Sequence, residues 1–168
     1  VSGYKLKNYN LLKILAKYYQ VHLVTVTDEK VDKDTKDFLE QYTFEYKVFK
    51  KTKFDLLLSA SKIFFNKEPL QVNYYYFTDV QNYINKISND FDLIISILVR
   101  TVKYMNNIQK PKIFDMADSI GQNYKKSQKN VKSILWKNIY KFEADKLLRY
   151  EKENIEIFDK TFLFNKQE

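Results

Sequence analysis

Short runs of apolar and β-branched residues alternate with helical segments along almost the whole chain. The predicted strands are residues 21–26, 44–50, 91–98, 112–116 and 160–164, and the predicted helices are residues 4–19, 32–42, 54–65, 79–88 and 130–154. Strands that are joined by helices usually pair in parallel, with the helices packed against the sheet. The alternation therefore predicts an α/β fold, with one Rossmann-like parallel sheet and helices on both of its faces.

Glycine and proline are scarce, with two of each among 168 residues. Tight hairpins depend on these residues, so the composition argues against an all-β fold. Hydrophobic residues make up 45% of the chain, which is far more than a disordered chain contains. A chain of this length can bury the core of one domain. We therefore predict a single Rossmann-like domain over residues 1–168.

The chain has no cysteine and one histidine, His22. Disulfides, thiolate metal sites and a cysteine nucleophile are excluded, and a zinc site is not expected. Because His22 lies inside an apolar run, we interpret it as a packed strand residue. We find no glycine-rich nucleotide loop and no metalloprotease or serine-hydrolase motif, and we expect no cofactor and no metal. No apolar run approaches the roughly 20 residues that span a bilayer.

The net charge of +8 and the isoelectric point of about 9.3 raise the question of an anionic partner. Lysine supplies most of the excess and arginine is nearly absent, as is typical of an AT-rich coding bias. Surfaces that bind nucleic acid usually cluster arginine and aromatic residues, whereas the tyrosines here are scattered. We therefore expect no nucleic-acid partner. A non-enzymatic basic α/β module that binds nucleic acid or an anionic membrane remains the alternative function.

Polar side chains follow several predicted strands at the points where those strands end. Thr25 and Thr27 close one strand, and residues 96–101 and 115–124 follow two others. In a doubly wound sheet, ligands bind beyond the carboxyl ends of the strands. The stretch "KIFDMADSIGQNY" (112–124) therefore predicts a binding loop.

The acidic residues of this loop have a second interpretation. Asp118 precedes "SIGQ", and a carboxylate at that position can accept hydrogen bonds from the free amides of a beginning helix. Binding and capping are equally open for Asp118, and capping is favoured for Asp115 if it still lies in the strand. Gly121 is interpreted as a turn residue.

Five segments resemble, in their order, the N-terminal domain of GT-B glycosyltransferases of the family 4 type. They are "SGYKLKNYNLLKILAKYYQVHLVTV", "DLIISILVRTVKYM", "KIFDMADSIGQNY", "FEADKLLRYE" and "FDKTFLFNKQE". The resemblance covers most of the chain. It implies one half of a GT-B fold, whose first strand would precede Val1 and whose donor-binding C-terminal domain would follow Glu168.

The resemblance implies the acceptor-binding domain of a retaining bacterial glycosyltransferase in polysaccharide biosynthesis. Such an enzyme moves a sugar from a nucleotide-sugar donor, held by the C-terminal domain, to a glycan or lipid-linked acceptor. We expect this chain alone to be inactive, and we expect a cytoplasmic location or one at the inner face of the plasma membrane. No catalytic residue is assigned.

The resemblance also implies a set of acceptor-binding residues. They are Gly3, Tyr4, Lys5, Arg100, Asp118, Ser119 and Tyr124. Gly3 and Tyr4 would form a loop facing the cleft, and Lys5 or Lys7 would take the place of the family arginine. Arg100 would hold an acceptor phosphate, and a surface ion pair is its weaker alternative.

Residues 50–69, "KKTKFDLLLSASKIFFNKEP", have two interpretations. Polar residues recur every three or four positions, so a helix here would carry one narrow polar stripe on an otherwise apolar surface. Such a helix can pack on the sheet, which is the favoured interpretation, or it can lie in the interface of an anionic membrane. The predicted membrane-facing residues are Lys50, Lys51, Lys53, Phe64 and Phe65.

Overall fold

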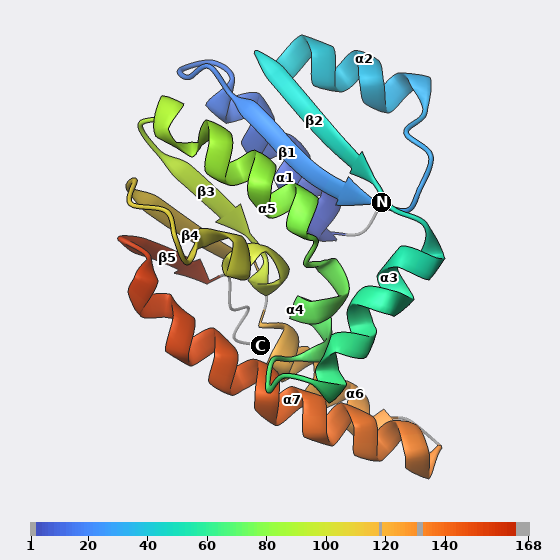
Figure 1. Ribbon diagram of the computed structural model, residues 1–168. Coiled ribbons are helices and arrows are strands. Elements are labelled where there is room, and N and C mark those ends of the chain that lie inside the picture. The colour runs from blue at the N-terminus through green and yellow to red at the C-terminus, as the bar shows by residue number, and fades with distance from the viewer. Residues whose placement is uncertain (1–2, 118, 131–132, 164–168) are drawn as a thin grey trace. The chain divides into compact units, whose positions relative to one another are not determined.

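The computed structural model describes residues 3–117, 119–130 and 133–163, and it has parallel strands in two small sheets (Figure 1). Strand β1 (His22–Thr27) pairs with β2 (Glu45–Lys50). The second sheet has the order β3 (Ile94–Ile97), β4 (Lys112–Ala117) and β5 (Lys160–Leu163). The prediction of an α/β fold with parallel strands is confirmed. Within the described residues, no strand pairing joins the two sheets into the single sheet that we predicted.

The strands are connected by helices of very different lengths. The α-helices are α1 (Gly3–Leu15), α2 (Lys33–Tyr42), α3 (Lys53–Ala60), α4 (Leu70–Tyr75), α5 (Thr78–Ile87), α6 (Ile120–Asn130) and α7 (Ile134–Asn154). Short 3-10 segments are η1 (Ser61–Phe64), η2 (Ser88–Asp90), η3 (Val99–Met105) and η4 (Ile155–Ile157). By its internal contacts the chain forms two compact units, Val1–Asp55 and Leu56–Glu168.

In the first unit, aromatic side chains connect α1 with α2. The rings of Tyr9 and Phe38 stack with their centroids 3.9 Å apart, and the Tyr42 ring lies 4.9 Å from Phe38. Leu39 is buried. Helix α2 begins at a side-chain cap, because Asp32 accepts a hydrogen bond of 2.8 Å from the Thr35 amide.

In the second unit, the core forms around the central strand β4. Phe114 of this strand is fully buried and stacks on Phe158 with ring centroids 5.0 Å apart. Val72, Val102 and Leu147 add fully buried side chains from α4, η3 and α7. A strand with neighbours on both sides and an apolar surface is expected to be this deeply buried.

The described structure differs from the predicted elements in several places. The helix predicted over 54–65 ends at Ala60 and continues as a 3-10 segment. Helix α4 was not predicted, since it is short and rich in tyrosine, and α6 was expected only in the capping interpretation of the stretch that begins at Asp118. Strand β1, predicted to be buried, is only half-buried.

Candidate functional site

Two residues with left-handed backbone lie side by side where β3 and β4 end. Leu98 has φ = 66° and Ala117 has φ = 54°. The Leu98 amide donates to the Asp115 carbonyl (2.9 Å), and the Ala117 amide donates to Asp115 Oδ1 (3.0 Å). Asp115 is buried, and its side chain holds this bend through an amide of the strand end rather than through an amide of a helix start. Non-glycine residues in this conformation cost roughly 1–3 kcal/mol each and collect at functional sites.

A buried polar cluster lies in the unit that contains these strand ends. Within the described residues, six buried side-chain atoms have no hydrogen-bond partner, and four of them are Gln71 Oε1, Arg100 Nε, Glu143 Oε1 and Tyr150 Oη. We call these four residues together with Tyr124 the Gln71 cluster. Its members come from α4, η3, α6 and α7.

Contacts around the start of α4 connect the cluster. Gln71 Nε2 donates to the Tyr124 hydroxyl (2.7 Å), and the Leu70 amide donates to Glu143 Oε2 (2.6 Å). The Arg100 guanidinium lies 4.6 Å from the centroid of the Tyr75 ring. Tyr75 and Gln71 both belong to α4. One short helix therefore brings together side chains that are far apart in the sequence.

The electrostatics of the cluster reflect its burial. Burial raises the pKa of the Tyr124 phenol; the hydrogen bond from Gln71 and the charge of Arg100 oppose this rise, and Glu143 adds to it. Burial also raises the pKa of Glu143, which the Leu70 amide and Lys146 counteract. The side chain of Glu143 is only 3% exposed, and Lys146 Nζ lies 3.9 Å from its Oε1. An ionic contact of that length leaves the oxygen without a hydrogen bond.

Tyr150 extends the cluster along α7. Its hydroxyl is buried without a partner, and burial raises its pKa, with the negative charge of Glu68 as a further cause. Glu68 pairs with Lys103, so Tyr150, Glu68 and Lys103 lie close together. Since Tyr150 is seven residues after Glu143, both side chains lie on nearly the same face of α7.

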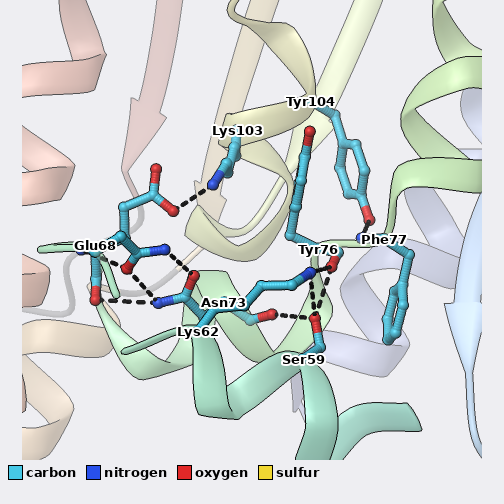
Figure 2. Close-up of polar contacts among 9 residues, drawn as sticks. Ser59, Lys62, Glu68, Asn73, Tyr76, Phe77, Lys103 and Tyr104 are labelled. Atoms are coloured by element: carbon cyan, nitrogen blue, oxygen red, sulfur yellow. Dashed lines mark hydrogen bonds and ion pairs between the residues drawn. The ribbon is translucent and has the colours of Figure 1, made fainter. Parts of the chain in front are cut away.

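A second polar network holds the carboxyl end of α4 (Figure 2). Ser59 Oγ lies 2.8 Å from the Asn73 carbonyl and 2.7 Å from the Tyr76 carbonyl. Lys62 Nζ donates to Ser59 Oγ (3.1 Å) and to the Tyr76 carbonyl (3.2 Å). Burial lowers the pKa of Lys62, the charge of Lys103 adds to this shift, and Glu68 opposes it. These polar groups are partnered, so we assign the network to structure.

The two networks place opposite charges at the two ends of α4. Glu143 accepts from an amide at the amino end, and Lys62 donates to a carbonyl at the carboxyl end. These are the signs that the dipole of a helix favours. The Gln71 side chain is thereby held on a helix that is fixed at both ends.

The structure brings two of the predicted site residues together, since Arg100 and Tyr124 both belong to the Gln71 cluster. The weaker alternative for Arg100 was a surface ion pair. Among the described residues, no carboxylate forms an ion pair with Arg100. Asp118 lies outside the described residues.

Ser119 is buried and has a structural role. Its hydroxyl donates to Glu151 Oε2 (2.6 Å) and accepts from the Gln122 amide (3.1 Å), which is the geometry of a helix cap. The Gly121 amide donates to Glu151 Oε1 (3.2 Å). The start of α6, which we predicted as a binding loop, is therefore occupied by a carboxylate of the chain itself.

The other predicted acceptor residues lie in the first unit. Gly3, Tyr4 and Lys5 form the first turn of α1, so the loop expected at Gly3 and Tyr4 is wrong. Their side chains lie outside the described part of the structure.

Three members of the Gln71 cluster were missed in the sequence. Glu143 and Tyr150 both lie in "FEADKLLRYE", and their spacing of seven was a usable sign of a shared helix face. Gln71 gave no such sign, because α4 itself was not predicted.

The predicted membrane-facing segment exposes apolar side chains. Phe54, Leu57, Leu58 and Phe65 are all exposed, Phe65 to 89%, while Leu56 and Ser59 are buried. Lys50 and Lys53 are exposed and Lys51 is half-buried. The backbone of Phe64 lies in η1, but its side chain is outside the described part. Helix α3 thus packs through one side and leaves an apolar side open.

Among the described helices, none combines the length and the apolar character required to cross a bilayer. Compared with models of known protein families, with curated proteins and with solved structures, the chain matches none.

Proposed function

We propose that this chain is the acceptor-binding half of a retaining glycosyltransferase, a Rossmann-like domain of the GT-B type. The Gln71 cluster binds hydroxyl groups of a glycan or of a lipid-linked sugar acceptor. The observation that carries this proposal is the set of buried polar atoms without a hydrogen bond at Gln71, Arg100, Glu143 and Tyr150. Each such atom costs about 1–3 kcal/mol, and a ligand that completes its hydrogen bonding recovers this cost.

The chemistry of the cluster suits a sugar. Arg100 Nε is a donor, Gln71 Oε1 and Glu143 Oε1 are acceptors, and the Tyr150 hydroxyl is both. A sugar hydroxyl can likewise donate and accept at once, so neighbouring hydroxyls can serve both kinds of group. The rings of Tyr75 and Tyr124 add apolar surface for the C–H face of a sugar ring.

The resemblance implies that acceptor and donor bind to different domains. This chain would hold and orient the acceptor, while the nucleotide-sugar donor would bind to a second domain. Bringing the two reactants together in a fixed geometry lowers the barrier to transfer. Neither a metal nor a cofactor has a part in this proposal.

The test is direct binding of glycans to the chain. Saturation-transfer NMR with a panel of mono- and disaccharides and short-chain lipid-linked sugars should find binders, and Arg100→Ala should weaken binding about tenfold or more. Arg149→Ala is the matched control, because Arg149 is an exposed arginine elsewhere on the chain. Absence of binding to the whole panel, or equal loss in both variants, contradicts the proposal.

A second proposal concerns location. We propose that the chain docks on the inner face of the plasma membrane through the exposed residues Phe54, Leu57, Leu58 and Phe65. The first three are spaced i, i+3 and i+4, so they share one side of α3. Apolar side chains enter the acyl boundary while the neighbouring lysines meet anionic headgroups, at about 1 kcal/mol per basic residue.

Vesicle sedimentation tests the docking. Binding should occur to vesicles with anionic lipid, and it should weaken with salt, with Leu57→Gln plus Leu58→Gln, and with Lys50→Glu plus Lys51→Glu. The control is Lys33→Glu plus Lys36→Glu, which changes the net charge by the same amount at exposed positions of α2. This control should weaken vesicle binding less than Lys50→Glu plus Lys51→Glu. Equal and negligible binding to neutral and anionic vesicles would refute the docking.

A further inference from the structure

A cavity of about 420 Å³ between α6 and α7 has a mostly basic lining. Lys125, Lys126 and Gln128 line it from α6, and Lys141 and Asp145 line it from α7. The two helices pack side by side in the same compact unit (Figure 1). The cavity is widely open to solvent, and its volume lies in the range of about 300–1,000 Å³ that is usual for small-molecule sites.

The charges of the lining do not balance. Among the described residues, the lining has three ammonium groups and one carboxylate. Lys125 Nζ lies 3.4 Å from Asp145 Oδ1, and both side chains are more than half exposed. An ion pair this exposed holds its partners weakly. Among the described residues, neither Lys126 nor Lys141 forms an ion pair.

We propose that this cavity binds a phosphate-bearing anion with two or more negative charges. Lys126 and Lys141 contact the phosphate oxygens, and the Gln128 amide adds a neutral donor. Lysine ammonium groups bind phosphate as point charges and do not require the fixed geometry of arginine. A singly charged carboxylate would leave the lining positive, whereas a diphosphate group would neutralise it and has room in the cavity. The inference is independent of the sugar-binding proposal.

The competing explanation is that these lysines are ordinary solvated residues of a basic chain. It predicts that any exposed lysine pair attracts anions equally well. Lys33 and Lys36 on α2 are exposed as well and do not line this cavity. They provide a control that removes the same two charges.

The site is tested by titrating the full chain with inorganic pyrophosphate at low salt. Isothermal calorimetry measures the affinity, and amide NMR shifts locate the binding. We expect saturable binding with shifts concentrated on α6 and α7. Lys126→Ala plus Lys141→Ala should weaken binding about tenfold or more, while Lys33→Ala plus Lys36→Ala should change it less than about twofold. Asp145→Asn removes the opposing carboxylate and should tighten binding.

Both lysines are exposed, so the double variant should fold, and circular dichroism checks this. Equal weakening by the two double variants, or shifts spread evenly over the chain, overturns the proposal. If Asp145→Asn does not bind pyrophosphate more tightly than the wild type, the proposal is overturned as well. This second test does not depend on the lysine variants. The phosphate group could belong to a soluble molecule or to a lipid headgroup, and vesicles with phosphatidic acid distinguish these two sources. The test uses the Leu57→Gln, Leu58→Gln chain, in which docking through α3 is weakened. The vesicles should displace pyrophosphate from this chain only if a lipid headgroup is the ligand.

Discussion

Gly121 lies where α6 passes very close to α7. A Cβ atom at this position would be 2.7 Å from Leu148 Cγ and 3.0 Å from the Leu148 backbone nitrogen. The residue belongs to the first turn of α6, so its interpretation as a turn residue was wrong. Glycine is required at this position because the two helices approach each other closely, and no local sequence pattern reveals such an approach.

We predict that Gly121→Ala lowers the free energy of unfolding by about 1–3 kcal/mol, although alanine is the better helix former. The added methyl group would overlap Leu148 Cγ and would also press on the Leu148 backbone nitrogen, so both the side chain and the backbone of α7 must shift. Urea unfolding measures the effect. Ser127→Ala, at an exposed position of the same helix, is the control and should stay within about 0.5 kcal/mol. A Gly121→Ala chain as stable as the control would contradict the close approach.

At the scale of elements, α7 supplies two buried carboxylates to the amino ends of two other helices. Glu143 accepts from the Leu70 amide at α4, and Glu151 accepts from the Gly121 amide and the Ser119 hydroxyl at α6. Free amides at a helix start need such acceptors. Burial nevertheless raises the pKa of Glu151, and its hydrogen bonds counteract only part of this shift.

The raised pKa predicts a pH dependence. The folded chain binds a proton at Glu151 more tightly than the unfolded chain, whose carboxyl titrates near 4.5. The stability from this group is therefore complete below pH 4.5 and is lost as the pH rises through the folded pKa. Glu151→Gln should remove this loss, so its free energy of unfolding should fall less between pH 4.5 and 7 than that of the wild type.

Urea unfolding at several pH values checks this difference. Glu153→Gln, at an exposed position of the same helix, controls for the change in net charge. Glu143 has the same direction of shift, so the double variant with Glu143→Gln should have a still flatter profile. Parallel profiles for wild type and Glu151→Gln would rule out this role for Glu151.

At the scale of the whole molecule, the two compact units differ in how much they bury. Among the described residues, Leu39 is the only buried apolar residue before position 56. The boundary falls inside α3, whose start is capped at Thr52: the Asp55 amide donates to Thr52 Oγ1 (3.1 Å) and Asp55 Oδ2 accepts from the Thr52 amide (2.8 Å). A fragment that begins at Thr52 keeps this reciprocal cap.

We therefore predict that residues 52–168 unfold cooperatively as a separate fragment, whereas residues 1–51 do not. A two-stranded sheet with little buried surface is marginal in water, and the larger unit has its own core. Urea unfolding followed by near-ultraviolet circular dichroism compares the two fragments. A non-cooperative transition in 52–168 would show that its core needs the first unit.

The proposed function leads to a prediction for the whole chain. Incubated with nucleotide sugars and lipid-linked acceptors, the purified chain should bind acceptor and yield no transfer product, because transfer needs a donor site on a second domain. Mass spectrometry of the acceptor measures this. Turnover by the chain alone would contradict its assignment as an acceptor-binding half.

The sequence by itself determined the elements whose pattern is local. The strands at 22–27, 45–50 and 112–117 follow from runs of apolar and β-branched residues, and their parallel pairing follows from the helices between them. Arg100 and Tyr124, which the resemblance implied as acceptor-binding residues, both belong to the Gln71 cluster, and their part in binding stays a prediction.

Only the tertiary structure decided where α4 forms and what surrounds it. Its six residues are too few to be stable as an isolated helix, and its ends are held by Lys62 and Glu143. The atoms of the Gln71 cluster that lack a hydrogen bond depend on burial by several elements at once. The strands form two sheets because of which strands exchange hydrogen bonds, and this pairing is also decided only in the folded chain. Burial and hydrogen bonding between distant residues are properties of the folded chain, and no short window of sequence contains them.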